Sequence, residues 1–176
     1  IGAQNNLGVC YELGLGVKKS ERKAFYWYEQ AAQEGESGAQ YNLGQCYRNG
    51  IGVKQNSEEA VYWYKKAADH GNVDATANLG VMYATGDGVV QDHSMAVALY
   101  RQAADMGSAH AQYNLGCCYG DGEGVEQNYK QAAYWLERAA EQGDADAQYY
   151  LSDLYEYGKG VELDEKKAMG LCLKAA

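Results

Sequence analysis

A repeat of 36 residues runs through the whole chain and constrains its fold more than any other feature. Each repeat opens with an alanine, carries a leucine four residues later and a tyrosine eight residues later, and none gains or loses a residue. The opening alanines are Ala3, Ala39, Ala75, Ala111 and Ala147. Such a period is the signature of a stacked repeat protein, in which each repeat buries its apolar face only against its neighbours.

Each repeat is predicted to form two helices. Ala39, Leu43 and Tyr47 lie four residues apart and therefore share one helical face. Gly44 lies beside that face at a cost of about 1 kcal/mol of helix propensity, which favours the close approach of a neighbouring helix. A second apolar stripe covers residues 60–71. The side chains expected to hold repeat to repeat in the core are Trp27, Trp63, Leu99, Trp135 and Leu171.

The residues between these segments agree with the helix boundaries. Gly50 falls where a left-handed cap ends the first helix. The second helices are preceded by preferred N-cap residues, namely Ser20, Asn56, Asp92, Asn128 and Asp164. Glu59 follows Asn56 by three residues, which resembles a capping box.

The composition excludes several classes of partner. The 176 residues include no proline and 22 glycines, and the net charge is −9. A nucleic-acid binder needs a basic face, and no cluster of lysine and arginine stands out. No apolar run approaches the roughly 20 residues of a membrane-spanning helix. We therefore expect neither a nucleic-acid partner nor membrane insertion.

A family resemblance rests on two segments of the second repeat. Residues 39 to 53 read Ala-Gln-Tyr-Asn-Leu-Gly-Gln-Cys-Tyr-Arg-Asn-Gly-Ile-Gly-Val, and residues 60 to 68 read Ala-Val-Tyr-Trp-Tyr-Lys-Lys-Ala-Ala. This pattern resembles the Sel1-like repeat, a relative of the tetratricopeptide repeat. The turn Gly-x-Gly-Val between the helices distinguishes the two forms. The resemblance covers the whole chain.

The resemblance implies an all-α fold, a right-handed α-α superhelical solenoid of about five 36-residue helix-turn-helix repeats. We expect one solenoid over residues 1–176, divided approximately into 1–38, 39–74, 75–110, 111–146 and 147–176. The chain opens without an initiator methionine and inside a first helix, so we expect it to be a piece of a longer protein.

The resemblance also implies a function, that of an adaptor which binds a peptide or a partner domain in a concave groove. A structural spacer within a larger protein is the alternative, and an enzyme is a remote one. The three histidines occupy different repeat positions, and we find no nucleophile–base pair or metal-ligand set. We therefore predict no catalytic residue, no metal and no cofactor. Some Helicobacter relatives carry a disulfide in each repeat, but the equivalent positions here hold pairs such as Ala32 and Gln40. The penicillin-binding or β-lactamase activity proposed for that subgroup is therefore not transferred.

If the tetratricopeptide geometry applies, the first helix of each pair lines the groove. One groove position holds Asn6, Asn42, Asn78 and Asn114, with Tyr150 in the last repeat. An amide both donates and accepts hydrogen bonds, so these side chains either hold the backbone of an extended peptide or bond the backbone of the neighbouring repeat. The sequence leaves both interpretations open.

Other groove positions differ between repeats, as specificity determinants would. They include Tyr41, Gln45, Arg48, Tyr113, Tyr149 and Asp153. Tyrosine is a frequent anchor at interfaces, and the last repeat adds Asp146, Glu156 and Tyr157. This predicts a tyrosine-rich, acidic C-terminal groove for a basic or aromatic segment. Arg48 is the only obvious cation, so a clamp for a C-terminal carboxylate is not expected. Cys117 also falls at a groove position, which makes it a candidate reactive thiol, although the sequence offers it no base partner.

The last repeat is irregular. Leu173 stands where the other repeats have Glu29, Lys65, Arg101 and Glu137, and neither end carries the polar cap of a finished solenoid. We therefore expect exposed apolar ends and self-association through them.

Overall fold

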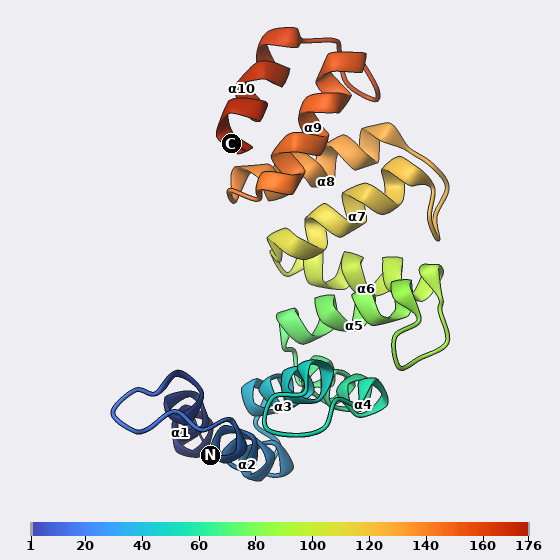
Figure 1. The fold of residues 1–176 in the computed structure, drawn as a ribbon. Coiled ribbons are helices and arrows are strands. Elements are labelled where there is room, and N and C mark those ends of the chain that lie inside the picture. Colours follow the sequence, from blue (N-terminus) through green and yellow to red (C-terminus); the bar gives the residue numbers. More distant parts are fainter. Residues whose placement is uncertain (1, 176) are drawn as a thin grey trace. The chain divides into compact units, whose positions relative to one another are not determined.

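A computed structural model describes residues 2–175, and within that range the chain forms ten α-helices and no strand (Figure 1). The first helices of the repeats are α1 (Gly2–Leu13), α3 (Ser37–Asn49), α5 (Val73–Thr85), α7 (Ala109–Asp121) and α9 (Ala145–Tyr157). The second helices are α2 (Glu21–Gln33), α4 (Ser57–Asp69), α6 (His93–Asp105), α8 (Tyr129–Glu141) and α10 (Glu165–Ala175). The all-α prediction is confirmed.

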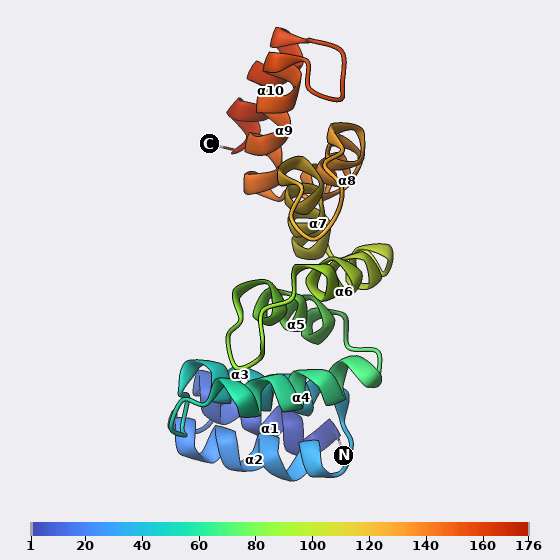
Figure 2. The same ribbon diagram turned by 90° about the vertical axis from the view of Figure 1, so that its right-hand side faces the viewer.

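The helices form two compact units, Ile1–Gln91 and Asp92–Ala176. In the first unit each helix from α1 to α4 packs against the next one along the chain (Figure 2). The same holds in the second unit from α6 to α10. The third repeat contributes α5 to the first unit and α6 to the second.

Glycine is required at both ends of the turn between the paired helices. Gly50 caps α3 with φ 72° and ψ 30°, the left-handed conformation that the sequence predicts. Gly52 also has a positive φ, and a Cβ on it would overlap the carbonyl oxygen of Glu21 at the start of α2. Each repeat therefore lays its turn against the helix start of the preceding repeat, where a side chain has no room.

Most of the expected N-caps form. The side chain of Asn56 accepts from the backbone N–H groups of Glu58 and Glu59, whereas Ser20 makes no side-chain capping bond. The predicted capping box is wrong, because the backbone N–H of Asn56 donates to the carbonyl of Tyr47 at 2.9 Å and is not available to Glu59.

The glycine within the first helix seats a large side chain of the second. A Cβ on Gly44 would lie 2.7 Å from the ring of Tyr64, which is fully buried, so the predicted close approach is confirmed. The same pairing joins Gly8 to Tyr28 and Gly116 to Leu136. In the last repeat both partners are small, and Ser152 Oγ lies 3.1 Å from Cys172 Sγ.

The tryptophans were expected in the core, and this is correct only in part. Trp135 and Leu171 are buried, whereas Trp27 and Trp63 are half-buried. The deepest position is the next one along the helix, where Tyr28 and Tyr64 are fully buried. One residue is a turn of about 100° on a helix, so the centre of the buried face lies slightly beyond the tryptophans.

Candidate functional site

The first helices of the first unit carry a polar face, which we call the amide face: Tyr41, Asn42, Gln45 and Arg48 of α3 with Asn78 of α5. Gln45 Nε2 donates to Tyr41 Oη at 2.7 Å, and Gln45 Oε1 accepts from the hydroxyl of the buried Tyr64 at 2.9 Å. Arg48 Nη1 donates to Asn78 Oδ1 at 3.1 Å. The amide face therefore uses much of its hydrogen-bonding capacity on itself.

The repeated asparagines bond within the protein, but not to the backbone of a neighbouring repeat. Asn42 Nδ2 donates to the side chain of Asn5 at 3.0 Å, and Asn78 accepts from Arg48. Asn114 Nδ2 donates to the carbonyl of His110, one turn earlier in its own helix, at 2.7 Å. Asn6 is exposed on α1. The four asparagines therefore share a repeat position without sharing a contact.

The equivalent face of the second unit, the tyrosine face, holds Tyr113 and Asn114 of α7 with Tyr149, Tyr150 and Asp153 of α9. Tyr150 and Asp153 line a cavity of about 330 Å³. Asp121, Tyr129 and Tyr157 complete its polar and aromatic wall. Tyr149 lies on the same helix with 61% of its surface exposed.

The two faces differ at one decisive pair of positions. Arg48 and Asn78 are bonded in the first unit, and the residues two repeats later are Gly120 and Tyr150. A Cβ on Gly120 would overlap the hydroxyl of Tyr150. This hydroxyl donates a hydrogen bond to Asp121 Oδ1 at 3.1 Å. Gly120 occupies the repeat position of Arg48, and Tyr150 occupies that of Asn78. Because Gly120 has no side chain, it leaves room for the ring of Tyr150.

The chain's own Lys159 rests on the wall of this cavity. Its ammonium lies 5.6 Å from the centre of the Tyr129 ring and 5.7 Å from that of Tyr157. Distances below about 6 Å are those of cation–π attraction. The rings of Tyr129 and Tyr157 therefore stabilise a cation, and the carboxylates of Asp121 and Asp153 line the same cavity.

Negative charge is concentrated in the second unit. Residues 92–176 hold 14 acidic and 7 basic side chains, a net charge of −7, whereas residues 1–91 hold 10 acidic and 8 basic, a net charge of −2. Burial and the neighbouring Asp121 carboxylate raise the pKa of the Tyr150 phenol. Burial, followed by the nearby Cys117, raises the pKa of Tyr113 to about 12. Both phenols stay neutral hydrogen-bonding groups at physiological pH.

Cys117 does not have the character of a reactive thiol. Burial raises its pKa to about 12, against a smaller opposing effect of its hydrogen bond with Tyr113. Since the thiolate is the nucleophile, Cys117 is almost wholly in its unreactive form near neutral pH. All five cysteines are free.

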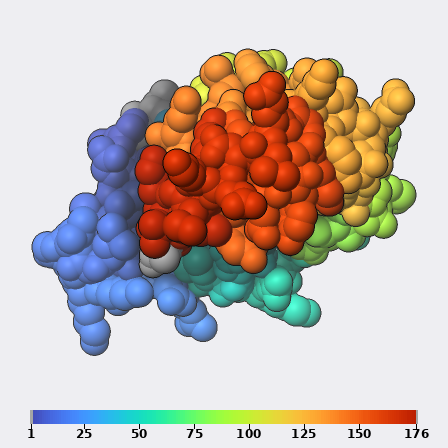
Figure 3. All heavy atoms as spheres, turned by 90° about the horizontal axis from the view of Figure 1, so that it is seen from above, coloured from blue at the N-terminus to red at the C-terminus, as the bar shows by residue number. Residues whose placement is uncertain are grey.

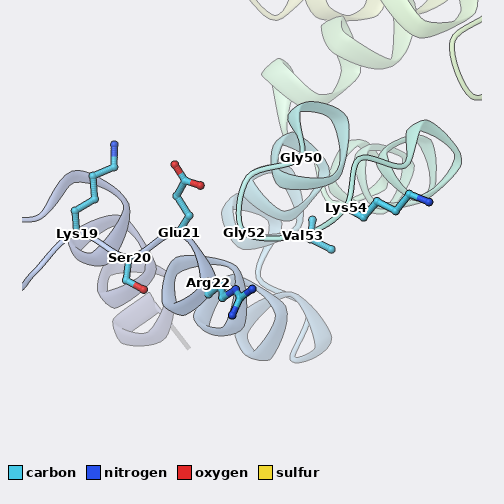
Figure 4. A pocket seen from close by; sticks show the side chains of 8 residues that line it. All are labelled: Lys19, Ser20, Glu21, Arg22, Gly50, Gly52, Val53 and Lys54. Carbon is cyan, nitrogen blue, oxygen red and sulfur yellow. The ribbon is translucent and has the colours of Figure 1, made fainter.

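Another cavity, of about 760 Å³, lies between the turns of the first two repeats. Lys19, Arg22 and Lys54 line it together with Gly50 and Gly52. Figure 4 shows that the three cationic side chains point in different directions rather than toward a common centre. The cavity therefore lacks the convergent polar groups of a ligand site.

The described residues contain no group of three or more His, Cys, Asp or Glu side chains placed to hold a metal ion. Among residues 2–175, no helix combines the length and the hydropathy that crossing a bilayer requires.

A family model for the Sel1 repeat matches residues 1–36, 37–72, 73–108, 109–144 and 145–176. The chain belongs to the Sel1 repeat family. Its matched repeats begin two residues before the opening alanines, at the start of the first helices α3, α5, α7 and α9. Sel1 repeats are generally protein-interaction modules, and proteins built from them are typically non-enzymatic scaffolds.

Two solved Sel1 structures are similar over 99% of this chain, each with a TM-score of 0.94. One is c5321, a protective antigen of uropathogenic Escherichia coli, which is 37% identical. The other is a Sel1 repeat protein from Oxalobacter formigenes, which is 36% identical. The chain spans 37% of the length of the first and 69% of the second.

More distant likeness extends to the Helicobacter pylori cysteine rich protein B, which is 27% identical over 74% of this chain and 94% of that one, with a TM-score of 0.58. None of the curated proteins matches the chain.

The sequence analysis names Tyr150 and Asp153, which line this cavity, but not Asp121, Tyr129 and Lys159, which line it with them. These three lie at the end of α7, at the start of α8 and in the turn after α9, on segments that a search of first-helix positions passes over. The sequence feature that could have indicated this cavity is Gly120, which stands at the repeat position of Arg48.

Proposed function

We propose that the chain is a non-enzymatic protein-interaction module whose tyrosine face binds a basic, extended segment of a partner protein. The observation that carries this proposal is the cavity of Asp121, Tyr129, Tyr150, Asp153 and Tyr157, which already stabilises the chain's own Lys159. A lysine or arginine of a partner would contact the rings that Lys159 contacts, in a cavity that the carboxylates of Asp121 and Asp153 also line.

The charge of the second unit supports the same proposal. A net charge of −7 attracts basic segments over several ångströms and accelerates their association. Tyr157, which lines the cavity, and Tyr149 on the same helix have 63% and 61% of their surfaces exposed and offer aromatic contact area. Tyrosine suits this task because it is large, has few rotatable bonds and ends in a polar group.

The amide face is less suited to a charged guest. Its one cation, Arg48, is bonded to Asn78, and the carboxamide of Gln45 is bonded on both sides. A ligand would have to break these bonds before it made its own, which lowers the net gain. We therefore place partner binding on the second unit.

The proposal is tested by calorimetric titration with a short peptide of alternating lysine and alanine. We expect binding that weakens with salt and that falls by about tenfold in a variant with Asp121→Asn and Asp153→Asn. The matched control, Asn42→Ala with Gln45→Ala, removes two side chains of the amide face and is expected to keep the affinity.

Equal binding of the corresponding glutamate–alanine peptide would show that the charge of the cavity does not select the partner. Absence of binding by either peptide would favour the alternative that the chain is a structural spacer.

A further inference from the structure

The cavity of the tyrosine face departs from the other repeats at three positions that meet in space. Tyr129 begins α8, whereas the other second helices begin with Glu21, Ser57, His93 and Glu165. Tyr157 ends α9, whereas the other first helices end with Leu13, Asn49, Thr85 and Asp121. Lys159 stands in the turn where the other repeats have Leu15, Ile51, Asp87 and Glu123. The contact between a lysine and two rings is therefore a property of this cavity and not of the repeat.

The backbone of the turn after α9 places Lys159 beside Tyr129. The backbone N–H of Lys159 donates to the carbonyl of Leu154 at 2.9 Å. Gly160 has a φ of 72°, and a Cβ on it would overlap the backbone carbonyl of Tyr129. The turn is thus fixed against the start of α8, whereas the side chain of Lys159 is exposed and free to leave the rings.

The ammonium of Lys159 is held by the rings alone. It lies 5.6 Å from the centre of the Tyr129 ring and 5.7 Å from that of Tyr157. Among the described residues, no carboxylate oxygen lies within 4.0 Å of this ammonium. A cation–π contact at an exposed site is weak, so the cation of a partner can displace Lys159 from the rings.

The rings are accessible to such a partner. Tyr157 has 63% of its surface exposed. This exposure belongs to the repeat position, because Asn49 and Asp121 are its equivalents and are also exposed although another repeat follows each of them. The last repeat, orange to red, faces the viewer in Figure 3.

We propose that Lys159 is a specificity-determining residue, which occupies the rings of the cavity until the cations of a basic segment displace it. This inference rests on the proposed function, because it concerns the same cavity. Since Lys159 belongs to the chain, its effective concentration at the rings is on the order of millimolar. A single free amine therefore competes poorly with it. A segment with several cations is also attracted by the net charge of −7 of residues 92–176 and displaces it.

Occupation by Lys159 also sets the affinity of the cavity. The apparent affinity of a site falls in proportion to the fraction of molecules in which the site is open. If Lys159 lies on the rings in about four molecules of five, the affinity for a partner is about fivefold lower than that of the open cavity.

The test compares the wild-type chain with Lys159→Met in calorimetric titrations of the lysine–alanine peptide. Methionine removes the cation and keeps an apolar stem, so the affinity should rise about fivefold, which corresponds to about 1 kcal/mol. Lys159→Arg restores a cation that stacks on aromatic rings and should keep the lower affinity of the wild-type chain.

The matched control is Lys130→Met. Lys130 follows Tyr129 directly and is exposed, but it does not line the cavity. Its removal changes the net charge by the same amount, and the affinity should change by less than about twofold, because exposed charges are screened by salt. An equal rise in affinity for both methionine variants would show that net charge alone is responsible and would overturn the proposal.

NMR observes the displacement directly. Protons above the face of an aromatic ring are shifted upfield by its ring current, so the ε-methylene protons of Lys159 should be upfield in the free chain. Saturation with the lysine–alanine peptide should return them to the ordinary position of an exposed lysine. Protons that are unshifted in the free chain, or that stay upfield at saturation, would contradict the proposal.

The two proposals fail in different ways. Equal affinity of the wild-type chain and Lys159→Met for the peptide would overturn the role of Lys159 and leave the proposed function intact. If the peptide bound neither chain, the proposed function would be refuted, and the role of Lys159 with it.

Discussion

The amide face and the tyrosine face occupy the same positions of the same repeat but differ in what they leave available. In the first unit Arg48 bonds Asn78, and Gln45 bonds Tyr41 and Tyr64. In the second unit the exchange of arginine for Gly120 admits Tyr150, and a cavity opens between carboxylates and rings. The repeat determines where a face lies, and a few side chains decide whether it is closed on itself or open to a partner.

The largest expected effect comes from returning the arginine of the amide face to the tyrosine face. In Gly120→Arg the new side chain overlaps the hydroxyl of Tyr150 and brings a cation to Asp121. We expect the affinity for the lysine–alanine peptide, measured by calorimetry, to fall by at least about tenfold. The reverse exchange, Arg48→Gly, should leave the affinity unchanged, and a loss there of similar size would contradict the assignment of the site.

A second prediction concerns Tyr64, which supports the amide face. Gly44→Ala forces a Cβ to 2.7 Å from the buried ring of Tyr64. Overpacking of about 1–3 kcal/mol outweighs a gain of about 1 kcal/mol in helix propensity, so stability should fall.

The matched exchange Gly170→Ala in α10 meets no atom within 4 Å and should stabilise the chain by up to about 1 kcal/mol. Urea unfolding of both variants checks the pair. If both variants changed the free energy of unfolding in the same direction, the close packing of glycine on tyrosine would not be what distinguishes the two positions.

The asparagines provide a smaller test. Asn42→Ala removes a bond between neighbouring repeats and should cost about 0.5–1.5 kcal/mol in urea unfolding. Asn114→Ala removes only a bond to its own helix and, although it lies on the tyrosine face, should leave the peptide affinity within about twofold. A larger loss of affinity would restore the interpretation that the asparagines hold a peptide backbone.

The smallest expected effect is a dependence of the free energy of unfolding on pH, caused by Cys46, which is buried on α3. Burial raises the pKa of the Cys46 thiol from 9.0 to about 12. The unfolded chain therefore loses this proton first, and stability that is fully present below pH 9 is lost as the pH rises toward 12. The expected loss is about 0.4 kcal/mol at pH 9, where half of the unfolded thiols are ionised. Cys46→Ala should flatten this part of the urea-midpoint profile, and an unchanged slope would mean that other groups cause it.

Much of the fold was predictable because its determinants are local and repeated. The period, the helix pairs, the cap at Gly50 and the close approach at Gly44 all follow from residues within one repeat. Tyr28 and Tyr64 are more deeply buried than Trp27 and Trp63. This difference was not predictable, because it depends on the rotation of each second helix against its neighbours.

The candidate sites were less predictable because they join different repeats. Gly120 and Tyr150 are 30 residues apart, and the period alone does not show that they meet. The division into 1–38, 39–74, 75–110, 111–146 and 147–176 within one solenoid, the concave groove and self-association through the ends stay predictions.

The most direct measurement is an NMR titration that maps the lysine–alanine peptide on the 176-residue chain. We predict that the backbone amides of Asp121, Tyr150, Asp153 and Lys159 shift with peptide concentration while those of Tyr41, Asn42 and Gln45 do not. Shifts confined to the amide face, or spread evenly over both faces, would contradict the claim that the second unit holds the binding site.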